Sequence, residues 1–337
     1  MKGLSWKLPE KIGHMIRHIR LPESIRHINF QSGIPHLFFL ASVLLVAIIT
    51  LFFVAFILYT ALPVFKSEGL INFITGTRWS YYEGVYGIRL FIIGTLIMTC
   101  VTLMLAVPVS VFTAMLLAEF APPRVASALR PLIELLVGIP SVVYGILGFF
   151  VLENVFRHHV DPFLCAALGS FIPFFRDVDP NSGSGILLAA TVLAVMVLPT
   201  ITSISEDVIR SVPSKYREAS FALGATRWET MKKVVLPISS SGILTATIIG
   251  MLRAMGEATA VVMLVGNAAK VPASITDTAY PMTAKILNEI CYYVAMDEPR
   301  SALFGVAAVL FAMQFFFVCA MRLVGGWDRI RLSTRPN

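Results

Sequence analysis

Two charged side chains interrupt an apolar stretch, where they could handle an anion. Arg253 and Glu257 are the charged residues of segment 240–266. A charge at the centre of a bilayer costs roughly 2.5–3.5 kcal/mol on insertion scales, so it must face protein or a water-filled path. The forked guanidinium suits the oxygens of a tetrahedral anion. The i, i+4 spacing predicts that both side chains share a helix face and neutralise each other. The alternative is a structural ion pair that only ties helices together.

The segment 211–237 is mainly polar and predicts a helical hairpin outside the bilayer. Ser214 follows a proline at a helix start, and Gly224 stands where a left-handed helix cap is expected. Thr226 and Glu229 form a T-x-x-E capping box that starts a second helix at once. Four residues recur at i, i+3, i+4 and i+7, which predicts one face of the first helix: Tyr216, Ala219, Ser220 and Leu223.

A stripe of small residues marks the segment 131–152. Its members recur at i, i+3, i+7 and i+10, on one face of a continuous helix: Gly138, Ser141, Gly145 and Gly148. Such a stripe lets another helix approach closely. Pro140 frees a backbone carbonyl and predicts a kink. Packing between two subunits and contact with a ligand both remain open for this stripe, and Glu134, near one end of the segment, is assigned no role.

The elements that must position these residues are membrane-spanning helices. The chain is 57% hydrophobic and 14% charged, whereas soluble domains carry roughly 25% charged residues. Because about 20 apolar residues cross the hydrocarbon, we expect an all-α, polytopic membrane protein. Its six expected spans lie at 36–62, 90–118, 131–152, 186–205, 240–266 and 301–321.

The distribution of basic residues predicts the orientation of these spans. With the N-terminus inside, 18 of the 27 Lys and Arg fall on the cytoplasmic side, as the positive-inside tendency requires. Both termini are then cytoplasmic: a basic arm over 1–35, a transmembrane domain over 36–325 and a tail over 326–337. The basic residues gather at the ends of spans, so the net charge of +7 indicates a lipid surface rather than nucleic acid.

Two segments assigned to the outer side have no assigned function. The segment 66–88 is rich in Trp and Tyr, which predicts an interfacial aromatic belt. Within the loop 153–185, the apolar run 163–175 is too short to span the bilayer and predicts an interfacial or re-entrant piece.

The sequence offers no catalytic, metal or nucleotide site. Its four cysteines are scattered, its histidines lie in the arm and one loop, and H-E-x-x-H and G-x-x-x-x-G-K-[ST] do not occur. A membrane-embedded enzyme is therefore disfavoured. No cofactor is expected.

The hairpin carries a resemblance to a known family. Glu218-Ala219-Ser220, then Gly224, then Val234-x-Leu236-Pro237 resembles the EAA loop of ABC-importer permeases. The resemblance implies a coupling helix that docks on a cytoplasmic ATPase, which would bind the ATP. The positions carried over to that role are Glu218, Ala219, Gly224, Leu236 and Pro237. Ser220 and Val234 depart mildly from the family pattern of Ala and Ile.

Three further runs narrow the resemblance. ELLVGIPSVVYG (134–145), RAMGEATAVVMLVGN (253–267) and DTAYPMTAKILNE (277–289) are similar to the phosphate-specific ABC importer, in its PstC-type permeases. The resemblance implies a MetI-like permease fold in the bacterial cytoplasmic membrane and alternating-access import of phosphate past Arg253 and Glu257. It also implies a PstA-type partner permease, two copies of a PstB-type ATPase and a periplasmic or extracellular phosphate-binding protein.

Two other transport functions remain as alternatives. A permease for another oxyanion, molybdate or tungstate, would use the same architecture. An ion-coupled secondary transporter would leave the capped hairpin without a purpose, and the chain shows no inverted repeat.

Overall fold

The computed structural model describes residues 33–170, 172–175 and 183–333. Residues up to Phe56 and from Ile57 onward form two compact units. The predicted arm at 1–35 lies largely outside the described residues, and of the predicted tail at 326–337 residues 326–333 are described and continue the last helix. The predicted all-α membrane fold is confirmed, because five helices are long and apolar enough to span a bilayer and one bent pair adds a sixth.

Helices make up nearly all of the described chain. The elements up to the bent pair are α3 (Gly33–Ser67), α4 (Leu70–Thr75), β1 (Trp79–Ser80), β2 (Val85–Tyr86), α5 (Arg89–Met115), η1 (Leu116–Phe120) and α6 (Pro123–Gly138). A nearly unbroken helical run follows as α7 (Ser141–Leu147), η2 (Gly148–Leu152), α8 (Glu153–Val155), η3 (Phe156–Val160) and α9 (Asp161–Leu168). The remaining elements are η4 (Pro173–Phe175), α10 (Ile186–Arg210), α11 (Ser214–Ala222), α12 (Arg227–Thr230), η5 (Met231–Val235), α13 (Leu236–Gly256), α14 (Thr259–Leu264), α15 (Met282–Tyr293) and α16 (Asp297–Ser333).

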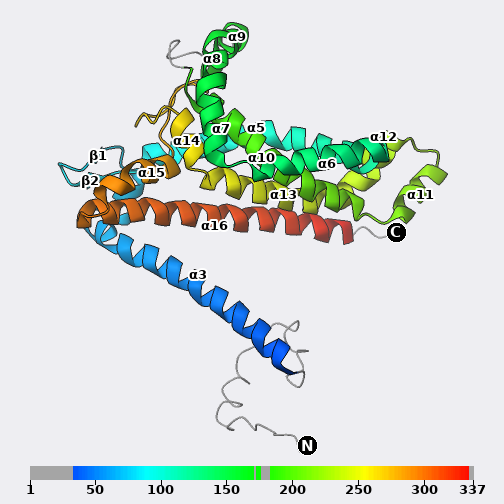
Figure 1. Cartoon of the computed structure of the whole chain (residues 1–337), viewed down its shortest axis with the longest axis horizontal. Helices are drawn as coiled ribbons and strands as arrows, with labels where there is room; N and C mark the ends of the chain where they lie inside the picture. The colour runs from blue at the N-terminus through cyan, green and yellow to red at the C-terminus, as the bar shows by residue number, and fades with distance from the viewer. Residues whose placement is uncertain (1–32, 171, 176–182, 334–337) are drawn as a thin grey trace, which may run out of the picture. The chain divides into compact units, whose positions relative to one another are not determined.

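The second unit is organised around α10. This helix lies beside α5 and α13, and α13 lies beside α16 (Figure 1). In the most apolar stretch of α10, 72% of the residues are buried, including Leu188, Leu193 and Ile201. A helix that is apolar on all sides belongs in the middle of a bundle.

The two ends of the bundle carry different elements. The hairpin helices α11 and α12 lie at one end, and β1, β2 and α15 lie at the other (Figure 1). Arg210 donates to the carbonyl of Leu117 at 3.0 Å, which places the last turn of α10 beside the end of α5. The amide of Ile186 donates to the carbonyl of Asp277 at 3.0 Å, at the opposite end. Because α5 and α10 run in the same direction, the chain between them returns along the bundle once.

The return segment differs from the single span predicted over 131–152. Helix α6 ends at Gly138, α7 begins at Ser141, and the pair is bent by 93°. Pro140 lacks an N–H and disfavours a helical residue before it, and Ile139 is extended with φ −73° and ψ 125°. The kink predicted at Pro140 is therefore a complete break.

The span predicted over 240–266 is also interrupted. Helix α13 ends at Gly256, and the short α14 starts only at Thr259. Glu257 between them is extended, with φ −72° and ψ 128°. The predicted site residues Arg253 and Glu257 therefore stand on opposite sides of a helix end.

The aromatic segment near residue 80 folds onto the protein. Strands β1 and β2 pair antiparallel with Trp79 opposite Tyr86. The rings of Trp79 and Tyr86 meet edge to face at 5.1 Å, and those of Trp79 and Tyr81 at 5.8 Å. These three rings pack against one another, whereas Tyr82 is fully exposed; the interfacial belt stays a prediction.

Candidate translocation site and coupling hairpin

Two helix breaks meet in the bundle. Ser141 begins α7 after the first break, and Thr259 begins α14 after the second. Their hydroxyl oxygens are hydrogen-bonded at 2.6 Å. The hydroxyl of Tyr144 donates to the carbonyl of Leu136 at 2.9 Å, so one carbonyl freed by the first break is satisfied from within α7. Broken helices that face one another are a common way to build an ion pathway in a membrane.

The small residues of α7 permit this meeting. A Cβ on Gly145 would lie 2.7 Å from the sulfur of Met263, and one on Gly148 would lie 2.8 Å from Leu264. The small face thus accepts α14 of the same chain. The prediction of one continuous stripe is wrong, because Gly138 lies on α6 before the break and a Cβ there would have no neighbour within 4 Å.

Glu257 does not pair with Arg253, which corrects the i, i+4 expectation. One carboxylate oxygen of Glu257 accepts from the amide of Thr259 at 3.2 Å, from its hydroxyl at 2.7 Å and from the amide of Ala260 at 3.4 Å. The carboxylate therefore caps α14. The pairing expected within a helix requires helical backbone between the two residues, and α13 ends at Gly256.

Arg253 is left with a neutral partner. Its guanidinium donates to the hydroxyl of Thr200 on α10 at 3.3 Å. Within the described part of the chain it forms no ion pair with a carboxylate. The side chain is half-buried, so its remaining donors are open to a ligand that reaches the two breaks.

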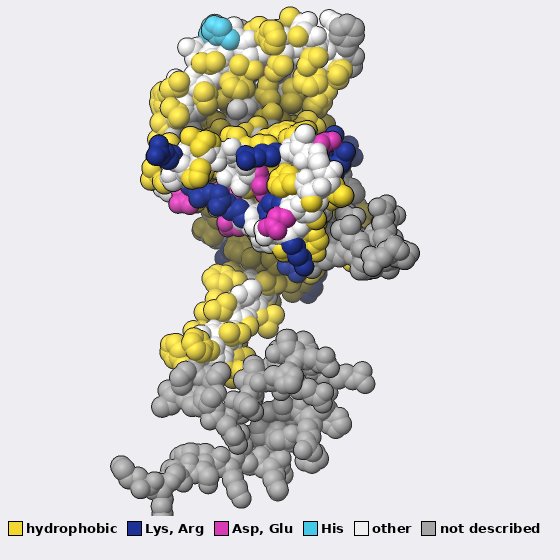
Figure 2. Space-filling view, turned by 90° about the vertical axis from the view of Figure 1, so that its right-hand side faces the viewer, with side chains coloured by type: hydrophobic (Ala, Val, Ile, Leu, Met, Phe, Trp, Pro, Cys, Tyr) yellow, Lys and Arg dark blue, Asp and Glu magenta, His cyan; other side chains and the backbone are white. Residues whose placement is uncertain are grey.

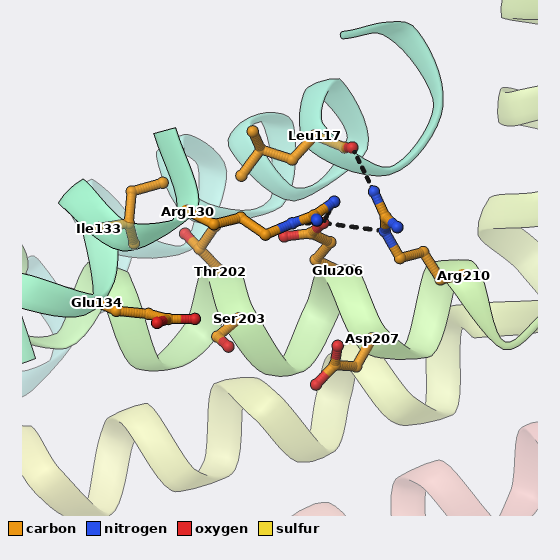
Figure 3. Close-up of a pocket in the computed structure, with 9 residues that line it drawn as sticks. All are labelled: Leu117, Arg130, Ile133, Glu134, Thr202, Ser203, Glu206, Asp207 and Arg210. Atoms are coloured by element: carbon orange, nitrogen blue, oxygen red, sulfur yellow. Dashed lines mark hydrogen bonds and ion pairs between the residues drawn. The ribbon is translucent and has the colours of Figure 1, made fainter. Parts of the chain in front are cut away.

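Two guanidinium groups lie around Glu206, near the end of α10. The sequence did not indicate this cluster. Glu206, only 6% exposed, accepts a hydrogen bond from Nε of Arg130 at 2.8 Å and forms an ion pair with Arg210 at 2.9 Å (Figure 3). These residues line a cavity of about 250 Å³ with Glu134 and Asp207. Three carboxylates against two guanidinium groups leave this cavity with no excess of positive charge, so it does not resemble an anion site. The bonds join α6, α10 and the end of α5.

The predicted hairpin is confirmed in detail. Helix α11 begins at Ser214, and Gly224 takes the left-handed conformation with φ +82°. The hydroxyl of Thr226 accepts from the amide of Glu229 at 3.2 Å, and the carboxylate of Glu229 accepts from the amide of Thr226 at 3.0 Å. This is the capping box expected from the spacing. The second helix continues through η5 into α13, where Leu236 and Pro237 form the first turn.

Arg217 anchors the hairpin, a role that the sequence did not indicate. It donates to the carboxylate of Glu119 at 2.6 Å and to the carbonyls of Ile209, at 2.9 Å, and Val212. These acceptors belong to η1, the end of α10 and the turn that follows it. The hydroxyls of Ser220 and Thr230 are hydrogen-bonded at 2.8 Å and join α11 to α12.

The outer surface of the hairpin is apolar and exposed. Of the residues predicted to share one face of the first helix, Ser220 is buried, whereas Tyr216 is 44% and Leu223 90% exposed. Trp228 on α12 is 51% exposed, and Glu218 and Ala219 on α11 are also exposed. Figure 2 shows basic and acidic side chains gathered at this end of the bundle. An apolar patch inside a charged rim is typical of a protein-binding surface.

The comparisons with known proteins settle the family. Residues 110–329 match the binding-protein-dependent transport system inner membrane component. The chain belongs to this family. It is a permease subunit of a binding-protein-dependent ABC importer and a multi-pass membrane protein, and it is not itself an enzyme.

Named relatives resemble the chain over most of their length. It is 37% identical over 263 residues to the probable ABC transporter permease protein YqgH of Bacillus subtilis, covering 77% of this chain and 79% of that protein. It is 35% identical over 269 residues to the phosphate transport system permease protein PstC of Xylella fastidiosa, covering 79% and 81%.

A solved structure has the same fold. A bacterial ABC transporter involved in the import of alginate matches with a TM-score of 0.57 and 18% identity, over 85% of this chain and 96% of that one. The predicted ABC-importer permease fold is thereby confirmed.

Proposed function

We propose that this permease carries inorganic phosphate into the cell as the PstC-type subunit of its importer. The observation that carries the proposal is the guanidinium of Arg253, which has a neutral partner on α10 and belongs to the last turn of α13 before the break at Glu257. Support comes from the phosphate permeases among the relatives, at 33–37% identity. A tetrahedral oxyanion fits forked donors that are not already neutralised.

The passage of phosphate past Arg253 requires weak binding. An ion must enter and leave a conduction path, so no single site can hold it tightly. The hydroxyl of Thr200, 3.3 Å from the guanidinium, is a weak partner that an anion can replace and that restores the resting arrangement afterwards. Glu257 contributes indirectly, because its carboxylate fixes the start of α14 beside the path.

ATP hydrolysis by a separate subunit drives the cycle. We assign the docking of a PstB-type ATPase, in two copies, to the exposed hairpin around Glu218, Ala219 and Gly224, with Leu236 and Pro237 carrying its motion into α13. A PstA-type permease completes the membrane pore. A phosphate-binding protein delivers the anion to the other end of the bundle, and both termini are cytoplasmic.

The test is uptake of labelled phosphate into vesicles that contain this chain, its partner permease and the ATPase, with binding protein outside. We expect uptake that requires ATP and that arsenate inhibits but molybdate and sulfate do not. ATP-dependent uptake of molybdate or tungstate instead of phosphate would overturn the substrate assignment and leave the importer architecture intact. Uptake that follows an ion gradient without ATP would overturn the coupling role of the hairpin.

A further inference from the structure

A lysine is buried among four aromatic rings at the end of the bundle that carries β1 and β2. Lys285 on α15 is 4% exposed. Its ammonium lies 4.5 Å from the ring centre of Trp79, 5.6 Å from Tyr81, 5.0 Å from Phe91 and 5.2 Å from Tyr280. Aromatic faces attract a cation, and desolvation strengthens that attraction. The four rings form an aromatic cage, and the ammonium of Lys285 occupies it.

The same cage holds a carboxylate. Glu289, one turn further on α15, accepts from Lys285 at 2.5 Å and from the hydroxyl of Tyr280 at 3.4 Å. The hydroxyl of Tyr81 also donates to it. We call Trp79, Tyr81, Phe91, Tyr280, Lys285 and Glu289 the aromatic lock. A buried ion pair contributes little net stability compared with apolar residues of the same volume, so the lock is better explained by the geometry that it fixes.

The lock fixes α15 to the β1–β2 hairpin. The ring of Tyr81 stacks on that of Tyr293, at the last turn of α15, with centroids 3.8 Å apart. The base of the hairpin is tightly closed, since a Cβ on Gly87 would lie 2.4 Å from the carbonyl carbon of Gly76. A displacement of the hairpin must therefore move α15.

The other end of α15 touches the candidate translocation site. The hydroxyl of Thr283 donates to the carbonyl of Glu257 at 2.9 Å, directly at the break between α13 and α14. The amide of Met282 donates to the hydroxyl of Thr95 at 2.9 Å. A single helix of 12 residues thus runs from the lock to the residue that caps α14.

Two exposed aromatic residues stand beside the lock. Tyr82, next to Tyr81, is fully exposed, and Tyr292, next to Tyr293, is 77% exposed. Glu83 and Glu298 are exposed close by, with Glu298 4.0 Å from the position of a Cβ on Gly84. Exposed tyrosines are over-represented among the residues that dominate protein interfaces, and the carboxylates favour a partner with basic groups at its rim.

We propose that Tyr82 and Tyr292 receive the substrate-loaded binding protein and that the aromatic lock, through α15, transmits its docking to the break at Glu257. The partner follows from the family, which depends on a binding protein, and from the position of the surface at the end of the bundle opposite the coupling hairpin (Figure 1). The inference rests on the proposed function for the identity of the partner.

The transmission test uses the full complex in lipid nanodiscs with phosphate-loaded binding protein. Tyr81→Phe removes the hydroxyl that donates to Glu289, and Glu289→Gln removes the negative charge beside Lys285; both keep the shape of the lock. We expect the binding protein's stimulation of ATP hydrolysis to fall about 5-fold or more, within the usual range of coupling free energies, while its Kd and basal hydrolysis stay unchanged. Tyr59→Phe, the same change at an exposed position on α3, is the matched control. Equal loss of basal and stimulated hydrolysis would reduce the lock to a structural element and overturn the inference.

The docking test uses Tyr82→Ala in the same preparation. We expect the Kd of the binding protein to rise about tenfold, as for an interface residue of moderate importance, with normal stimulation at saturation. An unchanged Kd together with altered sensitivity to anionic lipid would assign Tyr82 to the membrane surface and overturn the docking assignment. Absence of stimulation in the wild-type complex would instead contradict the proposed function.

Discussion

At the scale of single residues, the strength of each polar contact decides which side chains are free to act. Arg253 bonds a neutral hydroxyl, whereas Glu257 uses one oxygen for three donors on α14. A hydrogen bond between a charged and a neutral group contributes roughly 1.5–3 kcal/mol to stability. A bond from the same guanidinium to a phosphate oxygen can contribute at least as much. The two residues therefore have separate roles, one in binding and one in shaping the path.

This separation predicts unequal effects of two charge-removing substitutions. Arg253→Gln should lower ATP-driven phosphate uptake by about 100-fold, which corresponds to loss of one desolvated charged contact. Glu257→Gln keeps an acceptor oxygen for α14 and should retain most of the uptake. Both variants should assemble normally with the partner permease and the ATPase in detergent. Equal losses of phosphate uptake in the two variants would instead favour the interpretation that Arg253 and Glu257 act as an ion pair.

The aromatic lock predicts a titration near neutral pH. Burial lowers the pKa of Lys285 to about 7 and raises the pKa of Glu289 to about 7. As the pH rises through 7, Lys285 loses its proton; as the pH falls through 7, Glu289 gains one, so the ion pair is most populated around pH 7. Tyr81 and Tyr280 also face the pair, and burial raises the pKa of Tyr280 further above neutrality.

Fluorescence of Trp79 measures this titration, because the ammonium of Lys285 lies 4.5 Å from its ring. In a chain whose other three tryptophans are replaced by phenylalanine, the emission should change with a midpoint near pH 7. Lys285→Met should abolish the change. Glu289→Gln should move the midpoint to lower pH by about one to three units, because the neighbouring carboxylate favours the charged ammonium. An upward shift would contradict the assignment of the titrating group.

The sequence indicates some of these functional residues and not others. Arg253 stands out because a charge in an apolar run is rare. Its partner was mispredicted, because the spacing rule assumes a continuous helix. The lock was missed entirely, since Tyr81 and Glu289 are 208 positions apart and no local pattern brings them together.

At the scale of elements, the hairpin depends on one backbone conformation. Gly224 has φ +82°, and a Cβ there would meet no atom within 4 Å. A substitution therefore acts through the backbone alone. A β-branched residue strongly resists the left-handed region, whereas asparagine visits it more readily.

We accordingly expect Gly224→Val to impair the hairpin and Gly224→Asn to preserve it. The valine variant should lose co-purification of the ATPase or couple hydrolysis poorly to uptake, with the permease still folded. The asparagine variant should behave almost as wild type. Normal coupling in the valine variant would argue against docking at this loop.

The capping box and the left-handed glycine could be predicted because each depends on neighbours within a few residues. The helix breaks could not be placed in the same way. Pro140 allows either a kink or a break, and the bond between Ser141 and Thr259 that joins the two breaks depends on tertiary packing. The small-residue stripe failed for the same reason, since its period assumed that α6 and α7 were one helix.

At the scale of the whole molecule, the contacts at the ends of α5 and α10 decide whether the chain between these helices crosses the membrane an odd or an even number of times. Arg210 at the end of α10 contacts the end of α5, while Ile186 at the start of α10 contacts Asp277 at the opposite end of the bundle, so the bent pair counts as one crossing. Hydropathy alone predicted the same number of crossings, because that number depends only on the count of long apolar runs. It could not predict the 93° bend within one of them.

Cysteine labelling tests the proposed orientation. In a chain whose four native cysteines are serine, Leu223→Cys should react with a membrane-impermeant maleimide only from the cytoplasmic side. Tyr82→Cys should react only from the outside. Both positions are highly exposed, at 90% and 103%, so accessibility of the thiol does not limit the reaction. Labelling of both from one side would contradict the topology.

The bond between Ser141 and Thr259 also sets a time order for biosynthesis. The ribosome must add 118 residues after Ser141 before its partner exists. At roughly 5–20 residues per second, Ser141 has no hydrogen-bond partner on α14 for about 6–24 s. Gly145 and Gly148 lack their packing contacts with α14 for a similar time. During that interval the broken crossing formed by α6 and α7 lies in the membrane without α14. The insertion machinery or lipid must therefore shelter the small face of α7 until the second half of the chain has been synthesised.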